Sequence, residues 1–144
     1  MSRNAAKLKF LSAMEIELEE LLSNYVVGDG QISTLKINLD YHDDSKSTTT
    51  VELFIRKRAK KDKLEKCKIE LQFEKVIEVG ISEDFGSSYY SDITLVKQEN
   101  GSYYFSLDPY GNTGQPHADD NLVITAKSLY IHIEGKKAAS DIKS

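Results

Sequence analysis

Alternating apolar and polar residues mark the longest predicted strand of the chain, over residues 66–81. Apolar side chains fall at every second position from 67 to 73, which is the period of a strand with one buried face. The alternation slips at residues 74–76, so we predict a bulge or bend there. The positions expected to face inward are Cys67, Ile69, Leu71, Phe73, Ile77, Val79 and Ile81. A strand of this length is expected to lie centrally, with other strands paired to it.

A second period, of three to four residues, runs over residues 4–25. The apolar positions that share one stripe at this spacing are Leu8, Leu11, Met14, Leu18, Leu21, Leu22 and Tyr25. The spacing predicts one amphipathic helix with most of its glutamates off the apolar stripe. We expect the helix to end at Gly28 or Gly30, because glycine readily adopts the backbone conformation found after a helix C-terminus.

Shorter stretches with the period of two predict five further strands. They cover residues 32–39, 48–57, 92–97, 103–107 and 122–133. A polar loop at residues 40–47 should join the first two of these strands as a hairpin. Asn100 and Gly101 offer the positive backbone angles of a tight hairpin turn. Residues 126–128 interrupt the last strand, where we predict a second bulge.

Together these elements predict an α+β fold in a single domain over residues 1–144. The N-terminal amphipathic helix would pack on a curved, mainly antiparallel sheet of about six strands spanning residues 31–133, and residues 135–144 would form a frayed tail. A chain of 144 residues is long enough to bury the core of one such domain. Its one cysteine, Cys67, allows no intramolecular disulfide and should be a small buried hydrophobe.

Charge is distributed unevenly along the chain, although the net charge is only -4. Residues 56–68 hold eight basic residues against two acidic ones, while the rest of the chain holds 11 basic and 21 acidic residues. An acidic surface repels nucleic acid and attracts basic partners. The basic segment is expected to be a solvated hairpin tip, and it has none of the aromatic residues that help to bind nucleic acid. We therefore expect no nucleic-acid partner.

Catalytic and metal-binding motifs are absent from the sequence. The three histidines, His42, His117 and His132, have no zinc-ligand spacing, and the acidic pairs have no EF-hand spacing. Serine nucleophile elbows, P-loops and dinucleotide-binding glycine patterns are also missing. We expect a protein that is not an enzyme and that needs no cofactor or metal. Since no apolar run could form a signal peptide core or a membrane span, we expect a cytoplasmic protein without membrane contact.

Tyrosine residues are concentrated in one part of the chain, together with loop carboxylates. Five of the eight tyrosines fall within residues 89–110. Tyrosine offers rigid contact area at protein interfaces, and carboxylates steer and pair with basic partners. The alternative is that these rings complete the core or cover strand edges. The candidate partner-binding residues are Asp84, Tyr89, Tyr90, Asp92, Asp108, Tyr110, Asp119 and Asp120.

Several of the strand patterns also resemble those of a known group of proteins. They are Ile-Glu-Leu-Gln-Phe-Glu-Lys-Val from residue 69, Asp-Ile-Thr-Leu from residue 92, the stretches 103–111 and 122–131, and Tyr-His-Asp at residues 41–43. Over roughly residues 30–134 the chain is similar to small bacterial immunity proteins of polymorphic toxin systems. The resemblance implies a non-enzymatic inhibitor that binds a cognate toxin.

Combined with the acidic surface, this resemblance favours a basic toxin, such as a nuclease, as the protein partner. Acidic loops would mimic the phosphates of the nuclease substrate and occlude its surface. Two alternatives remain from other functional classes. One is a small-ligand carrier with the curved sheet wrapped around a cavity, and the other is a metal-dependent enzyme that uses His117 and the neighbouring loop acids.

Overall fold

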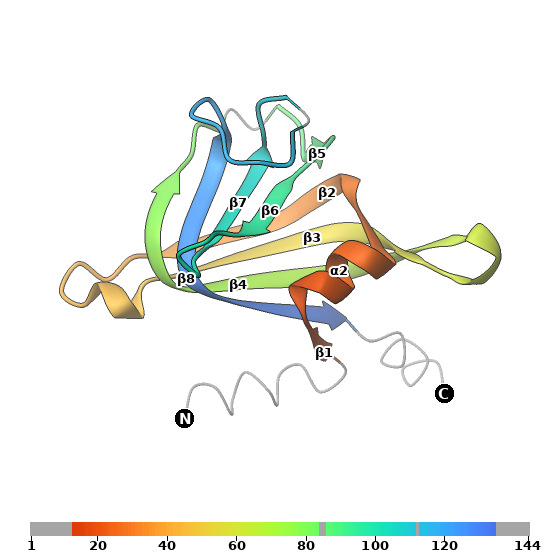
Figure 1. The fold of residues 1–144 in the computed structure, drawn as a ribbon, viewed down its shortest axis with the longest axis horizontal. Helices are drawn as coiled ribbons and strands as arrows, with labels where there is room; N and C mark the ends of the chain where they lie inside the picture. The colour runs from red at the N-terminus through yellow and green to blue at the C-terminus, as the bar shows by residue number, and fades with distance from the viewer. Residues whose placement is uncertain (1–12, 84–85, 112, 135–144) are drawn as a thin grey trace.

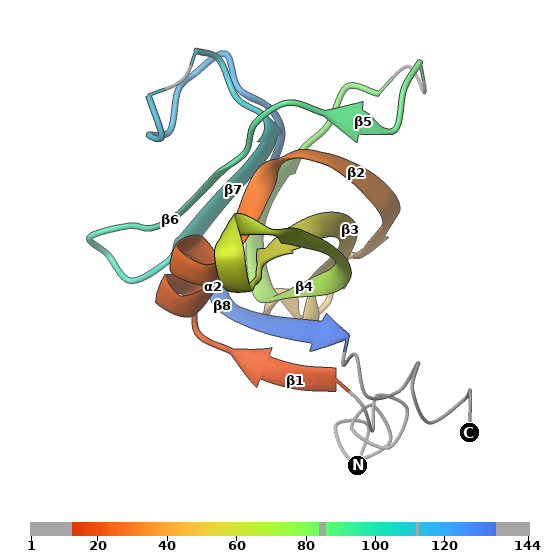
Figure 2. The same ribbon diagram turned by 90° about the vertical axis from the view of Figure 1, so that its right-hand side faces the viewer.

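One curled antiparallel sheet forms almost all of the fold. The computed structural model describes residues 13–83, 86–111 and 113–134. In these residues the sheet has eight strands: seven have the order β5-β2-β3-β4-β8-β7-β6, and the eighth, β1, pairs with β8. The elements are β1 (Ala13–Ile16), α2 (Leu18–Asn24), β2 (Tyr25–Asn38), η1 (Asp44–Lys46), β3 (Thr48–Arg58), η2 (Lys60–Asp62), β4 (Leu64–Gly80), β5 (Tyr89–Tyr90), β6 (Thr94–Lys97), β7 (Tyr103–Asp108) and β8 (Asn121–Glu134). The sheet curls into a half-barrel (Figure 1 and Figure 2), which confirms the predicted curved, mainly antiparallel sheet.

The central strand is β4, as its length suggested. It pairs with β3 from Leu64 to Glu74 and with β8 from Ile69 to Gly80. The predicted irregularity is also present, because Lys75 has a positive φ of 55° and the register with β8 shifts between Val76 and Glu78.

The prediction that Ile77, beyond this bulge, faces inward is wrong. Val76 is buried at the bulge, while the side chain of Ile77 is 56% exposed. The left-handed conformation of Lys75 puts Val76 on the same side as Phe73, and Ile77 therefore points outward. Val79 does pack against the core, as predicted, but Ile81 lies beyond the end of the strand and is 37% exposed.

The last strand, β8, changes its buried side at the position that faces the β4 bulge. Leu122, Ile124 and Ala126 are buried in its first half, whereas Ile131 and Ile133 are buried in its second half. The change falls at the predicted interruption, residues 126–128. The extra residue itself lies in β4, however, because the β8 partners of Val76 and Glu78 are the consecutive residues 126 and 125. Both strands thus bend at the same place, where the sheet turns upward in Figure 1.

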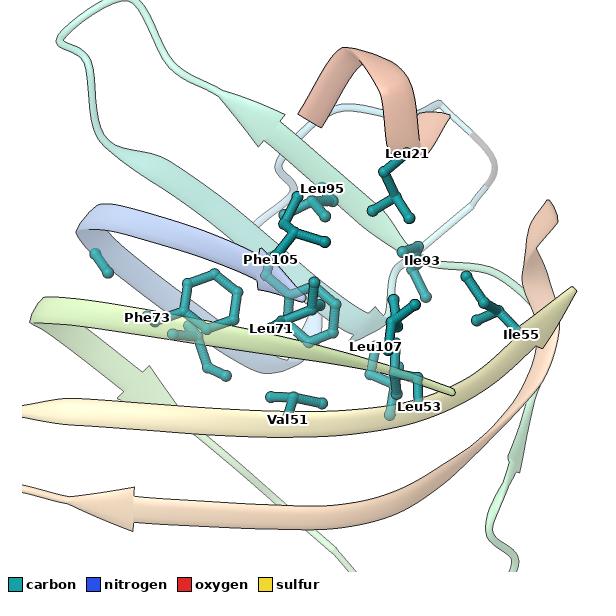
Figure 3. Packing of buried hydrophobic residues seen from close by; sticks show 14 of the residues in the cluster. Leu21, Val51, Leu53, Ile55, Leu71, Phe73, Ile93, Leu95, Phe105 and Leu107 are labelled. Atoms are coloured by element: carbon teal, nitrogen blue, oxygen red, sulfur yellow. The ribbon is translucent and has the colours of Figure 1, made fainter. Parts of the chain in front are cut away.

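The core fills the inside of the half-barrel with side chains from facing strands. Leu53 of β3, Leu71 and Phe73 of β4 and Phe105 of β7 are fully buried. The rings of Phe73 and Phe105 are tilted against each other, with centroids 5.6 Å apart. Figure 3 shows these side chains converging between the strands, with Leu21 of α2 covering one end. The core therefore joins strands that the bend in β4 and β8 brings face to face.

The predicted N-terminal helix is only partly right in the part that is described. Residues 13–16 form β1 instead, which pairs with β8 and buries Ile16, and the helix α2 has only seven residues. Pairing with the outer edge of β8 outweighs the helical spacing of the sequence, which is a weak local preference. Residues 4–12 of the prediction lie outside the described residues, as does the tail at 135–144. In the described part of the chain, no helix is long and apolar enough to cross a membrane.

The expected helix end at Gly28 or Gly30 is also wrong. Strand β2 begins at Tyr25, directly after α2, and both glycines lie within it. Its pairing with β3 is interrupted between Val26 and Gln31, and Asp29 there has a φ of 52°. The glycines thus serve an irregular part of a strand rather than a helix C-terminus.

The predicted hairpin connections are present. The loop at 40–47 contains the short η1 turn and contacts the β4 bulge through the Val76 N–H, which donates to the Ser47 carbonyl at 3.1 Å. At the β6–β7 turn the Gly101 N–H donates to the Gln98 carbonyl at 2.9 Å. Gly101 has the expected positive φ, but Asn100 does not, so the turn does not have the predicted pair of positive angles.

We predict that Leu71→Ala lowers the free energy of unfolding by about 2 to 5 kcal/mol, because it leaves a cavity in a filled core. Leu71 is 0% exposed and lies in the centre of β4. The matched control is Ile77→Ala in the same strand, where the exposed side chain should cost about 0.5 kcal/mol or less. Urea denaturation of both variants measures the two costs, and equal costs would contradict the inward face assigned to β4.

Candidate functional site

A pocket of about 450 Å³ lies at the end of the half-barrel where β7 ends and β8 begins. It is lined by Ile32, Ser82, Glu83, Ser87, Ser88, Tyr89, Tyr90, Ser91, Asp92, Leu107, Asp108, Pro109, Asn121 and Leu122. We call it the acidic pocket, because the lining includes three carboxylates and no basic side chain among the described residues. Four of the eight candidate residues meet here, namely Tyr89, Tyr90, Asp92 and Asp108.

One wall of the acidic pocket is the segment 88–91, which is bound to the irregular part of β2. Strand β5 pairs with β2 at Gly30 and Gln31. Further backbone hydrogen bonds run from the Ile32 N–H to the Ser88 carbonyl at 2.8 Å and from the Asp29 N–H to the Ser91 carbonyl at 2.7 Å. This wall is thus held by backbone groups on the edge of β2 that faces away from β3.

Tyr90 anchors this wall from the inside. Its hydroxyl donates to the Val27 carbonyl at 2.6 Å, and its ring packs so close to Gly30 that a Cβ there would lie 2.5 Å from the hydroxyl oxygen. Burial raises the pKa of Tyr90 well above its usual value, and the nearby Arg56 guanidinium offsets only part of this rise. Tyr90 therefore has a structural role. Tyr89 points the other way, with 74% of its surface exposed, and can contact a partner.

The opposite wall is held by a clamp between Asn121, the first residue of β8, and Ser82, just beyond the end of its partner strand β4. The Asn121 side-chain oxygen accepts from the Ser82 N–H at 2.9 Å, and its amide donates to the Ser82 carbonyl at 2.7 Å. Asp108, at the end of β7, lies beside this clamp and is exposed. Asp92 accepts a hydrogen bond from its neighbour, the Ile93 N–H, at 2.8 Å. Asp92 and Asp108 thus line one polar pocket from two elements, the segment after β5 and the end of β7.

Asp120 organises the long loop after β7 rather than facing the acidic pocket. Its two oxygens accept from the Tyr104 hydroxyl at 2.6 Å, the Tyr110 N–H at 2.7 Å and the His117 N–H at 2.9 Å. Burial raises the pKa of Asp120, but these hydrogen bonds outweigh it, so the pKa is lower than usual. Burial and the bond to Asp120 raise the pKa of Tyr104 to about 12.

The remaining candidates lie on or near this loop. Tyr110 is 58% exposed, and its ring stacks on that of His117 with centroids 4.5 Å apart. Asp119 is exposed beside them. Asp84 lies outside the described residues. The structure therefore gives one pocket with four candidates and an adjoining loop with Tyr110, Asp119 and Asp120.

The loop histidine has little capacity left for a metal. His117 Nδ1 accepts the Asp119 N–H at 3.0 Å, and both oxygens of Asp120 already accept hydrogen bonds. In the described residues no three His, Cys, Asp or Glu side chains are grouped as a metal site would need. Cys67 is half-buried, and burial raises the pKa of its thiol, so it is a poor nucleophile.

Sequence reasoning missed the polar residues that complete the acidic pocket. They are Ser82, Glu83, Ser87, Ser88, Ser91 and Asn121. The repeated serines between residues 82 and 91 were a visible signal of a loop with many hydrogen-bonding groups. Asn121 meets Ser82 because the β4–β8 register places the two residues opposite each other, two positions beyond the pair Gly80 and Val123, and the sequence pattern did not reveal that register.

Comparison with protein-family models, curated proteins and solved structures found no match to this chain.

We predict that Gly30→Ala loosens the wall formed by residues 88–91. The added Cβ would lie 2.6 Å from the Phe54 carbonyl oxygen, and this backbone cannot move aside easily. The free energy of unfolding should fall by about 1 to 3 kcal/mol, and amide hydrogen exchange at Tyr90 should accelerate. Gly80→Ala is the matched control, since nothing lies within 4 Å of its Cβ. Unchanged exchange at Tyr90 in the first variant would contradict this packing.

We predict that Asp120 makes stability depend on pH in the acid range. Because its pKa is lowered in the folded protein, its contribution is complete above the usual value of 3.8 and is lost as the pH falls through the folded pKa. Asp120→Asn should be less stable than the wild type at neutral pH and should lose less stability on acidification. Thermal unfolding from pH 7 to pH 2 tests this, with the exposed Asp119→Asn as the control that should follow the wild type.

Proposed function

We propose that this protein is a non-enzymatic inhibitor, an immunity protein that binds and neutralises a basic protein toxin in the bacterial cytoplasm. The observation that carries the proposal is the acidic pocket, in which Tyr89, Asp92 and Asp108 meet on two walls that are fixed by hydrogen bonds. A nuclease is the partner class that fits this chemistry best, because nucleases present basic surfaces to phosphates.

The proposed mechanism is occlusion by charge complementarity. Carboxylates steer a basic partner toward the pocket and then pair with its Lys or Arg side chains. Tyr89 supplies an exposed ring with only two side-chain torsions to order, so its entropy cost on binding is small. Tyr110 and Asp119, on the adjoining loop, extend the contact surface. Bound in this way, the protein would cover the substrate surface of the toxin without any chemical step.

The alternative functions have less support. A carrier needs space inside the half-barrel, but Phe73, Phe105 and Leu71 occupy the region between the strands. A metal-dependent enzyme based on His117 would need ligand atoms that already accept hydrogen bonds within the loop. Neither objection applies to a protein-binding role, which needs only an exposed, preformed surface.

We predict that the double variant Asp92→Asn and Asp108→Asn binds its toxin about tenfold or more weakly, because two charge pairs are lost. Asparagine keeps an oxygen that can accept the Ile93 N–H, so the pocket should keep its shape. The toxin is sought as the product of the neighbouring gene and by affinity purification from the source cell. Titration calorimetry then measures affinity, and an activity assay measures inhibition.

The matched control for this experiment is Asp44→Asn with Glu99→Gln, two exposed acids remote from the pocket. It changes the net charge equally and should bind and inhibit like the wild type. The proposal fails if no basic protein is captured, if the captured protein keeps its activity in the complex, or if both double variants bind equally well.

A further inference from the structure

The end of the β3–β4 hairpin, residues 56–66, forms a projecting basic arm. It extends beyond α2 at the right of Figure 1, away from the loops around the acidic pocket. Two extended strands build it, with Lys57 opposite Glu65 and Arg58 opposite Leu64. A hollow of about 550 Å³ in the arm is lined by Lys57, Arg58, Ala59, Lys60, Lys61, Lys63 and Glu65. The arm therefore presents a concentrated positive surface that can reach another molecule.

At the tip of the basic arm, charged residues occupy strained backbone positions. Lys61 and Asp62 have φ values of 61° and 59°, the positive pair found in type I′ turns. Such turns prefer Asn-Gly, because most other residues are strained at positive φ. Arg56, opposite Lys66 at the base of the arm, has a structural role instead, because its guanidinium donates to the Gly28 carbonyl of β2 at 2.7 Å. A tip that only connected two strands would not need the positive pair at Lys61 and Asp62, which suggests a binding role for the charge that it carries.

We propose that the basic arm docks into the acidic pocket of a second copy of this chain. The two surfaces are complementary in charge, since the arm hollow is lined by Lys and Arg and the pocket by Glu83, Asp92 and Asp108. They are also complementary in apolar contact, because Leu64 on the arm is 47% exposed and Tyr89 at the pocket is 74% exposed. The inference rests on the acidic pocket being the docking site for basic protein groups, as in the proposed function.

A second copy fits the basic arm better than nucleic acid does. DNA and RNA are long polyanions, so a bound strand would come near the body of the protein as well as the arm. The acidic remainder of the chain would repel it. The described arm also has no aromatic ring for base stacking. In a symmetric pair each copy could give one arm and receive another, so both contacts would form together. Such a pair would hold the acidic pocket covered until a toxin with higher affinity displaces the arm.

The test is sedimentation equilibrium of the wild type at about 20 mM and about 300 mM salt, because screening weakens contacts between exposed charges. We expect a species about twice the monomer mass at low salt and the monomer at high salt. The arm variant Lys60→Glu, Lys61→Glu and Lys63→Glu should be monomeric at both concentrations. The pocket variant Glu83→Lys and Asp108→Lys should also be monomeric. All of these positions are exposed, so circular dichroism should show folded proteins.

An equal mixture of the arm variant and the pocket variant tests the contact between arm and pocket directly. Each carries the reversed charge that the other needs, so the mixture should form a mixed dimer at low salt although neither variant associates alone. The matched control is Lys36→Glu, Lys97→Glu and Lys127→Glu, exposed residues outside the arm. It has the same net charge as the arm variant and should associate like the wild type.

Three outcomes would overturn self-association through the arm. They are a monomeric wild type at low salt, equal loss of association in the control and the arm variant, and a mixture that stays monomeric. If short duplex DNA binds the wild-type arm while the protein stays monomeric, the arm is a polyanion site instead. A monomeric wild type whose Asp92 and Asp108 variant still loses toxin binding would leave the proposed function intact, so the two failures can be told apart.

Discussion

The pairing of β4 with β8 is the interaction on which the rest of the structure depends. Both strands change their buried side at paired positions. Lys75 has a left-handed conformation there, between the pairs Glu74–Ser128 and Val76–Ala126. A sheet without this change would continue as an open twisted surface with one wet face. The bend instead turns β7 and β6 over β3, so that Phe105 can meet Phe73 and close a core between parts of the same sheet.

The acidic pocket is a consequence of the same bend. One wall comes from residues 88–91, which include β5 and pair with β2. The other comes from the end of β7 and the start of β8, which lie toward the other end of the strand order. These walls meet only because the sheet curls. Two local devices then fix them, the Gly30 and Tyr90 packing on one side and the Asn121 clamp on the other. The side chains that could contact a partner are therefore held by groups that lie behind them.

Local patterns could predict the strands but not the partners that the strands find. The alternation around Leu71 and the slip before Val76 are properties of a few neighbouring residues, so β4 and its bulge were predictable. The stretch with Met14 and Ile16 fits both a helical stripe and a strand, and only the outer edge of β8, near the other end of the chain, decides between them. The predicted helix end at Gly28 or Gly30 is wrong for the same reason, because Gly30 is required by the Tyr90 ring rather than by a helix terminus.

The candidate residues divide in a similar way. Composition alone could identify a region rich in Tyr and Asp, and that region does contain the acidic pocket. It could not separate Tyr89, which is exposed, from Tyr90, whose hydroxyl is bonded to the Val27 carbonyl, because adjacent residues of a strand point to opposite sides. Nor could it separate Asp119 from Asp120, whose oxygens are used to order the loop. Hydrogen bonding decides which members of an acidic cluster remain available to a partner.

The separation of charge within one chain has a physical consequence of its own. If the basic residues of the arm were spread over the body, they would neutralise the carboxylates, and the acidic pocket would attract basic proteins weakly. Placing them on a projecting hairpin removes them from the pocket, and the Debye length of about 8 Å in physiological salt limits how far their potential reaches. The strands of the arm stay paired as far as Arg58 and Leu64, and the arm projects away from the loops around the pocket (Figure 1). Because the arm projects, its positive charges leave the negative electrostatic potential of the acidic pocket largely unchanged, whatever the arm binds.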